Sequence, residues 1–137
     1  MSYLVDSSVW LEMLLGQERA DSARRFLLRL STQELAVTEF SLYSIGLALT
    51  RLGQGEIFRQ FITDILISAQ IRRLVLSADE LRDIPEVMRH FRLDFDDAYQ
   101  YVAAQKHDLT IVSFDADFDR TERGRKTPEQ ILQELAP

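Results

Sequence analysis

Residues 109–119 read LTIVSFDADFD, a short apolar run followed by an acid at every second position. A continuous run such as 109–112, with no polar alternation, is typical of a strand buried on both faces of a parallel sheet. The acids Asp115, Asp117 and Asp119 predict a loop that begins where this strand ends. The stretch therefore predicts a buried strand that delivers carboxylates to one edge of a sheet.

Three similar apolar runs lie upstream, separated by segments in which apolar residues recur at helical spacing. We expect these runs to form strands over 2–5, 34–37 and 74–76. A helix predicted after the third run contains Pro85, which is expected to kink or divide it. Short apolar strands that alternate with helices favour a parallel sheet covered on both faces. The predicted fold class is α/β, a single three-layer α/β/α domain over 1–137 with a central parallel sheet of four to five short strands.

The composition narrows the classes of function. The chain has 16 Lys and Arg against 22 Asp and Glu, a formal charge of −6, so it is not expected to coat nucleic acid by bulk charge. Its lack of Cys excludes disulfides, thiolate metal sites and a cysteine nucleophile, and fits the reducing cytoplasm. The apolar stretches 40–49 and 61–71 are too short to span a membrane, and the N-terminal residues do not resemble a signal peptide. We therefore expect a cytoplasmic protein.

Acids occupy the positions where an open parallel sheet gathers its functional groups, just beyond the carboxyl ends of the strands. Those acids are Asp6, Glu39, Asp94, Asp96, Asp97, Asp115 and Asp117. Carboxylates a few ångström apart repel one another unless a cation neutralises them. Because the chain has no Cys and only two His, the suitable cation is a hard, oxygen-seeking one such as Mg²⁺ or Mn²⁺. Two such ions ~4 Å apart would support cleavage of a phosphodiester.

Each acid also has a purely structural interpretation. Asp6 is suited to cap the first helix, and Glu39 in a first helical turn is favoured by the helix dipole. The acids of 115–119 resemble a calcium loop, but Arg120 and Lys126 stand where an EF-hand loop requires Gly and Glu. A solvated acidic loop balanced by the basic residues that follow it remains an alternative.

Four blocks of the chain resemble the PIN-domain nucleases, a family that includes the VapC-like toxins of toxin–antitoxin pairs. The blocks are LVDSSVW at 4–10, VTE at 37–39, DFDDA at 94–98 and TIVSFDADF at 110–118. The resemblance implies a PIN-like fold and a Mg²⁺- or Mn²⁺-dependent endoribonuclease that cleaves single-stranded RNA with a metal-activated water. It also implies a homodimer and, for the toxin branch, a small antitoxin protein as partner.

Carried over by position, the resemblance assigns roles to individual residues. The residues implied to bind metal and to be catalytic are Asp6, Glu39, Asp97 and Asp115, with Asp117 as an additional ligand. Ser7 and Ser113 match positions that hold the cluster through hydrogen bonds. Of the two adjacent acids, Asp97 matches the family's metal-ligand position, because that ligand directly precedes a small residue, here Ala98. Asp96 is expected to lie beside the site without binding the metal directly.

The chain departs from many toxin members at Phe114, where they have a basic residue. One alternative to a ribonuclease is a PIN-fold scaffold that acts through protein contacts. An aspartate-based phosphatase is less favoured, because its second Asp would stand at Ser8. Arg120 and Arg123 follow the acidic loop and are predicted to guide RNA phosphates. The single Trp10 is expected to anchor the core or an interface rather than to stack on a base.

Overall fold

The computed structural model describes residues 1–137 and contains one sheet of four parallel strands. The strands are β1 (Tyr3–Val5), β2 (Leu35–Thr38), β3 (Arg72–Leu74) and β4 (Thr110–Val112). Their order is β3-β2-β1-β4, so the first strand of the chain lies at the centre next to the last. The predicted α/β class and the parallel sheet are confirmed.

One face of the sheet is covered by α1 (Ser7–Leu14), α2 (Ala20–Arg29), α3 (Glu39–Arg51), α4 (Gly55–Ile62) and α8 (Pro128–Leu135). Tyr3 and Val5 point into this layer, where Trp10 is fully buried against the ring of Phe61. Trp10 is therefore a core anchor, as predicted.

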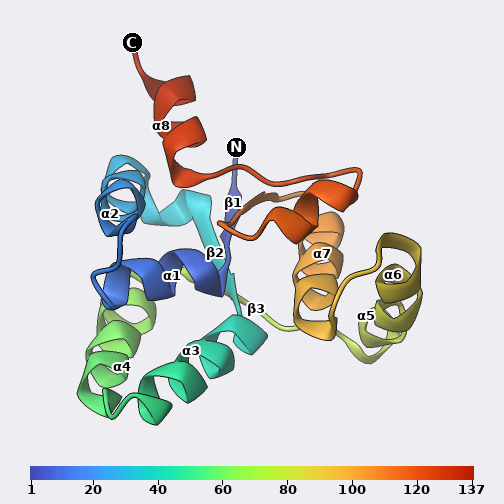
Figure 1. The fold of residues 1–137 in the computed structure, drawn as a ribbon, viewed down its shortest axis with the longest axis horizontal. Coiled ribbons are helices and arrows are strands. Elements are labelled where there is room, and N and C mark those ends of the chain that lie inside the picture. The colour runs from blue at the N-terminus through green and yellow to red at the C-terminus, as the bar shows by residue number, and fades with distance from the viewer.

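The opposite face is covered by α6 (Ile84–Phe91) and α7 (Phe95–His107), and the short α5 (Ala78–Arg82), which has no buried residue, precedes α6. Leu4 and Ile111, which alternate with the residues of the first face, pack into this second core. Figure 1 shows the two layers on either side of the sheet, with α8 and the C-terminus extending away from it.

Several element boundaries differ from the sequence expectation. The third strand ends at Leu74 and does not extend to residue 76, because the edge strand pairs only with 36–38 of β2. The helical segment between β2 and β3 does not stay α-helical, because α4 is followed by a π-helical segment, Thr63–Ser68. The expected division near Pro85 is confirmed, since Pro85 lies in the first turn of α6. The acidic loop forms a short 3-10 helix, η3 (Ala116–Arg120), and another, η1 (Thr32–Glu34), precedes β2.

The register of the strands aligns their carboxyl ends. Val5 of β1 is level with Val112 of β4, and the Asp6 amide donates to the Val112 carbonyl at 2.9 Å. The segment before α8 then returns beside β4, where the Ser113 amide donates to the Lys126 carbonyl at 3.0 Å. Residues that follow β1 and β4 are thereby fixed side by side. In this fold every helix is too short or too polar to traverse a lipid bilayer.

Candidate active site

A cleft of about 230 Å³ lies at the carboxyl edge of the sheet. Its lining combines carboxylates, hydroxyls and an amide with two apolar side chains, and includes no Lys, Arg or His. The lining residues are Asp6, Ser7, Ser8, Leu11, Phe40, Ser41, Ser44, Asp96, Asp97, Gln100 and Asp115. They come from the junction between β1 and α1, where Asp6 lies, from α1 itself, from α3, from α7 and from the loop after β4. The fold thus gathers acids that are up to 109 positions apart in the sequence.

Asp6 is held inside this cleft by three side chains. Its Oδ2 accepts hydrogen bonds from the Ser8 hydroxyl at 2.9 Å and the Ser113 hydroxyl at 2.8 Å. Its Oδ1 accepts from Gln100 Nε2 at 3.2 Å. Although Asp6 occupies the N-cap position of α1, its side chain makes no capping hydrogen bond there. The carboxylate is therefore directed to the cleft, and the capping interpretation does not describe it.

Gln100 is oriented by a buried chain of hydrogen bonds that sequence reasoning missed. The Thr38 hydroxyl donates to Gln100 Oε1 at 2.6 Å and accepts from the Ser41 amide at 3.0 Å, which caps α3. This chain joins the end of β2 to α7 and, through Gln100, to Asp6. The available signal was the spacing of three between Asp97 and Gln100, which places both side chains on one face of a helix.

Three carboxylates meet where α7 approaches the loop after β4. One oxygen each of Asp97, Asp115 and Asp117 lies within 4.8 Å of the others. Asp115 is fixed by its own backbone, because its amide donates to the Ser113 hydroxyl at 2.9 Å. Its Oδ1 accepts from the Asp117 amide at 2.9 Å, which caps η3. Asp97 is buried, whereas Asp117 is partly exposed.

The electrostatics of the cluster favour protonation when no cation is present. Burial, the charges of Asp115 and Asp96, and a hydrogen bond to Asp115 together raise the pKa of Asp97 to about 8. Burial also raises the pKa of Asp6 above its ordinary value, although the hydrogen bonds from Ser113 and Ser8 oppose the shift. The cleft therefore concentrates more negative charge than it can hold fully ionised.

Glu39 lies at the start of α3 but does not line the cleft. Its Oε1 accepts a hydrogen bond from the Tyr43 hydroxyl and lies 3.3 Å from Nη2 of Arg73 on β3. The hydrogen bond from Tyr43, with the Arg73 guanidinium, lowers the pKa of Glu39. Of the acids predicted to bind metal, Glu39 is the one that the structure turns away from the others.

The remaining predicted polar residues lie close to the cluster in different ways. Ser113 donates directly to Asp6, as described above. Ser7 and Asp96 line the cleft, and the hydroxyl that contacts Asp6 from α1 belongs to Ser8, one residue later. Because Ser7 and Ser8 are adjacent on a helix, the rotation of α1 decides which of them faces the acid.

The two arginines predicted to guide phosphates occupy separate places. Arg120 lies beside the acids, with Nη2 3.1 Å from Asp117 Oδ1. Arg123 pairs with Asp108 at 3.0 Å and donates to the Leu109 carbonyl, at the amino end of β4. The structure brings Arg120 to the cluster and leaves Arg123 at the opposite edge of the sheet.

A basic side chain that the sequence did not indicate lies near Phe114, the position at which many VapC-like toxins have a basic residue. The guanidinium of Arg19 covers the Phe114 ring, with Cζ 3.9 Å from the ring centroid. The Phe114 amide in turn donates to the Ser8 hydroxyl at 3.1 Å. A cation thus stands next to the strand end that carries Asp115, although residue 114 itself is aromatic.

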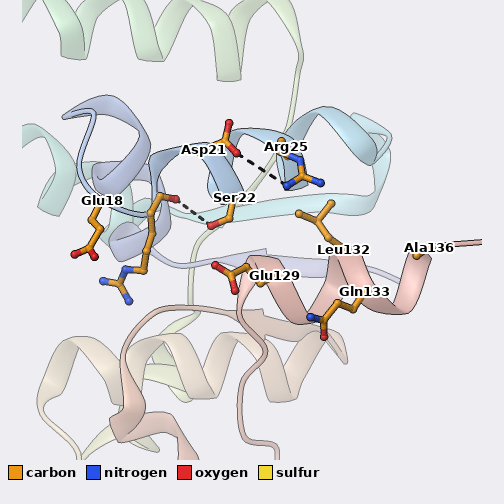
Figure 2. Close-up of a pocket in the computed structure, with 9 residues that line it drawn as sticks. Glu18, Asp21, Ser22, Arg25, Glu129, Leu132, Gln133 and Ala136 are labelled. Atoms are coloured by element: carbon orange, nitrogen blue, oxygen red, sulfur yellow. Dashed lines mark hydrogen bonds and ion pairs between the residues drawn. The ribbon is translucent and has the colours of Figure 1, made fainter.

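A larger cavity, of about 590 Å³, lies between α2 and α8 (Figure 2). Acidic and basic side chains intermingle around it, and its ion pair between Asp21 and Arg25 spans 4.0 Å with both side chains largely exposed. No cluster of like charge forms there, and the strand ends do not reach it. The smaller acidic cleft is therefore the better candidate for chemistry.

The acidic cleft fits a hard divalent cation. Its donors are carboxylate and hydroxyl oxygens, the ligands that Mg²⁺ and Mn²⁺ prefer. No cationic side chain lines the cleft, so nothing in its lining offsets the negative charge that raises the pKa of Asp97. Asp97, Asp115 and Asp117 bring their oxygens close enough together for one ion. Asp6 lines the same cleft as Asp97 and Asp115.

Comparisons with solved structures identify the fold. The chain is similar to VapC20 of Mycobacterium tuberculosis, a Sarcin-Ricin loop cleaving toxin, with a TM-score of 0.75 and 23% identity over 86% of this chain and 93% of that one. It is similar to a toxin-antitoxin complex from Klebsiella pneumoniae, with a TM-score of 0.72 and 19% identity over 93% of this chain and 98% of that one. FitAcB from Neisseria gonorrhoeae gives a TM-score of 0.71 and 18% identity over the same shares.

Comparison with curated proteins finds no match. The family model of the PIN domain matches residues 3–124. This range includes all four strands and every acid that lines the cleft. The chain therefore belongs to the PIN domain family.

Proposed function

We propose that this protein is a divalent-metal-dependent endoribonuclease that cleaves single-stranded RNA and acts in the cytoplasm as the toxin of a toxin–antitoxin pair. The observation that carries the proposal is the meeting of Asp97, Asp115 and Asp117 within 4.8 Å beside the buried Asp6. Membership of the PIN domain family supports it, as do structural neighbours described as a Sarcin-Ricin loop cleaving toxin and a toxin-antitoxin complex.

Within this proposal some residues bind the metal ion and others orient those ligands. Asp6, Asp97 and Asp115 hold Mg²⁺ or Mn²⁺, with Asp117 as a further ligand. When bound, such an ion supplies an acidic centre that activates water and stabilises negative charge on a phosphodiester. Ser8, Ser113 and Gln100 orient Asp6 through the hydrogen bonds described above.

Two further side chains complete the proposed centre. Glu39 would be a further ligand only if its side chain left Arg73 and Tyr43. Arg120 and Arg19 are the cations placed to meet RNA phosphates beside the acids. Arg123 would contact phosphates only of an RNA strand long enough to reach the opposite edge of the β-sheet.

The decisive experiment measures Mn²⁺ binding by calorimetry and cleavage of a fluorescent single-stranded RNA on the same samples. We expect Asp97→Asn to weaken Mn²⁺ binding and to reduce kcat by about 100-fold or more, because loss of a residue that only orients a ligand typically costs 10–100-fold and Asp97 is itself a proposed ligand. Asp79→Asn, a change at a 95% exposed acid on α5, is the matched control and should leave both quantities unchanged.

A wild-type protein that binds no Mn²⁺ and cuts no RNA would instead support the scaffold alternative.

The toxin assignment has its own test: induced expression should arrest bacterial growth, and Asp97→Asn should relieve the arrest. Co-expression with the product of a short upstream reading frame tests for an antitoxin, and light scattering on the purified protein tests for the proposed homodimer.

A further inference from the structure

An aromatic cluster borders the acidic cleft and ends in an exposed ring. Tyr99 is buried, and its hydroxyl accepts a hydrogen bond from the Leu76 amide at 3.3 Å. The Phe40 ring lies 5.3 Å from Tyr99 and 5.8 Å from Phe95, measured between centroids. Phe95, the outermost of the three, keeps 47% of its surface exposed. The cluster therefore reaches from the core to solvent.

This cluster is contiguous with the proposed catalytic residues. Phe40 lines the cleft together with Asp97. Phe95 is the first residue of α7, two positions before Asp97, and acids flank it on both sides in the sequence. A half-exposed aromatic ring therefore lies within two residues of a proposed metal ligand and is accessible to a molecule bound at the cleft.

The charges around the cluster indicate which part of RNA covers it. The cleft lining has four carboxylates and no cationic side chain, so it repels phosphates wherever no metal ion intervenes. The basic side chains described near the acids, Arg19, Arg73 and Arg120, are each paired with an acid. A nucleobase is uncharged and has a flat π face, and aromatic rings bind it by stacking with little dependence on sequence.

We propose that Phe95 and Phe40 form a stacking site for an unpaired nucleobase adjacent to the bond that is cut. The inference rests on the proposed ribonuclease function and adds to it a reason for single-strand preference. A base within a duplex is stacked between its neighbours and is not free to lie on Phe95, whereas a base of a single strand is.

The test compares Phe95→Leu, which keeps apolar area but removes the π face, with Phe95→Tyr, which keeps the π face. With wild-type Mn²⁺-loaded enzyme and single-stranded RNA as reference, we expect Phe95→Leu to raise KM about tenfold, the effect of one stacked base. We expect kcat to change less than twofold, and Phe95→Tyr to match the wild type. Leu28→Ala, at an exposed apolar residue on α2, is the control for lost surface area.

Two further measurements separate the outcomes. An RNA with an abasic nucleotide next to the cleavage site should raise the wild-type KM as much as Phe95→Leu does, and the variant should show no additional loss. An RNA carrying 2-aminopurine at that nucleotide should be quenched on binding to wild type and not to Phe95→Leu.

Unchanged KM and unchanged quenching in Phe95→Leu would overturn the stacking site while leaving the ribonuclease proposal intact. A variant that loses binding of a co-expressed antitoxin but not of RNA would overturn it in favour of a protein-docking surface. A wild-type protein that neither cleaves RNA nor quenches 2-aminopurine would overturn both proposals.

Discussion

Asp6 and Asp97 are both buried carboxylates, but their surroundings differ. Three side chains donate hydrogen bonds to Asp6, which offset part of the cost of burying its charge. Asp97 faces other acids, and these raise its pKa further. At neutral pH the metal-free protein therefore keeps a proton on Asp97, and that proton must leave before the carboxylate can bind a cation.

The residue-scale prediction concerns the pH dependence of metal binding. Because a ligand must be deprotonated, Mn²⁺ affinity should rise with pH up to about 8, the pKa of Asp97, by at most about tenfold per pH unit for one proton. Calorimetry at pH 6.5 and 8.5 measures the dissociation constants, and buffers of different ionisation enthalpy measure the protons released. Equal affinity at the two pH values would contradict the assignment of Asp97 as a ligand.

The sequence indicated the acids and Ser113, but not the other two side chains that hold Asp6. Asp6, Asp97 and Asp115 follow from strand ends and a helix start, which are local features. Ser8 and Gln100 were missed, because the choice of hydrogen-bond partner depends on how α1 and α7 are rotated against the sheet.

At the scale of elements, Thr38 connects three parts of the fold. It ends β2, caps α3 and donates to Gln100 of α7. Thr38 is fully buried, so neither contact can be replaced by water without rearrangement. The position of α7, and with it that of Asp97, depends on this residue.

Thr38→Val should therefore lower the free energy of unfolding by about 2–4 kcal/mol, the sum of a lost cap and a buried amide oxygen left without its donor. Urea denaturation measures the change. Thr127→Val is the matched control, because Thr127 caps α8 at an exposed capping box and has no buried partner, and it should cost about 1 kcal/mol. Equal losses in the two variants would show that the bond to Gln100 adds nothing.

Element boundaries show the same division between local and tertiary information. The division at Pro85 and the cap at Thr38 were predictable from residue type. The end of β3 was not, because the length of an edge strand is set by its only neighbour, β2. Val75, predicted to lie in the strand, is instead 59% exposed.

At the scale of the whole molecule, the acidic cleft lowers stability when it holds no cation. Folded Asp97 keeps its proton up to about pH 8, whereas an aspartate of the unfolded chain loses it near pH 3.9. Between these values the folded state binds more protons, so the free energy of unfolding falls as pH rises. This contribution of Asp97 is fully present below pH 4 and is lost as pH passes 8.

The metal-free wild type should accordingly have a lower Tm at pH 8.5 than at pH 5.5, and each kcal/mol lost lowers Tm by about 4 °C. Asp97→Asn cannot ionise and should show a smaller decrease. Adding Mn²⁺ at pH 8.5 should raise the Tm of the wild type and have little effect on the variant. Thermal unfolding followed by circular dichroism in the presence and absence of EDTA tests all three expectations, and identical pH profiles for the two proteins would refute them.

By itself the sequence determined the parallel α/β fold and the edge of the sheet to which the acids go, because strand hydrophobicity and strand-end residues are local patterns. Only the tertiary structure decided that Asp97 meets Asp115 and Asp117, that Glu39 turns to Arg73, and that Arg120 rather than Arg123 stands beside the acids. The packing of the helices against the sheet sets the distances between the carboxylates, their burial and their pairing with cations. Those three quantities in turn set which carboxylates keep a proton.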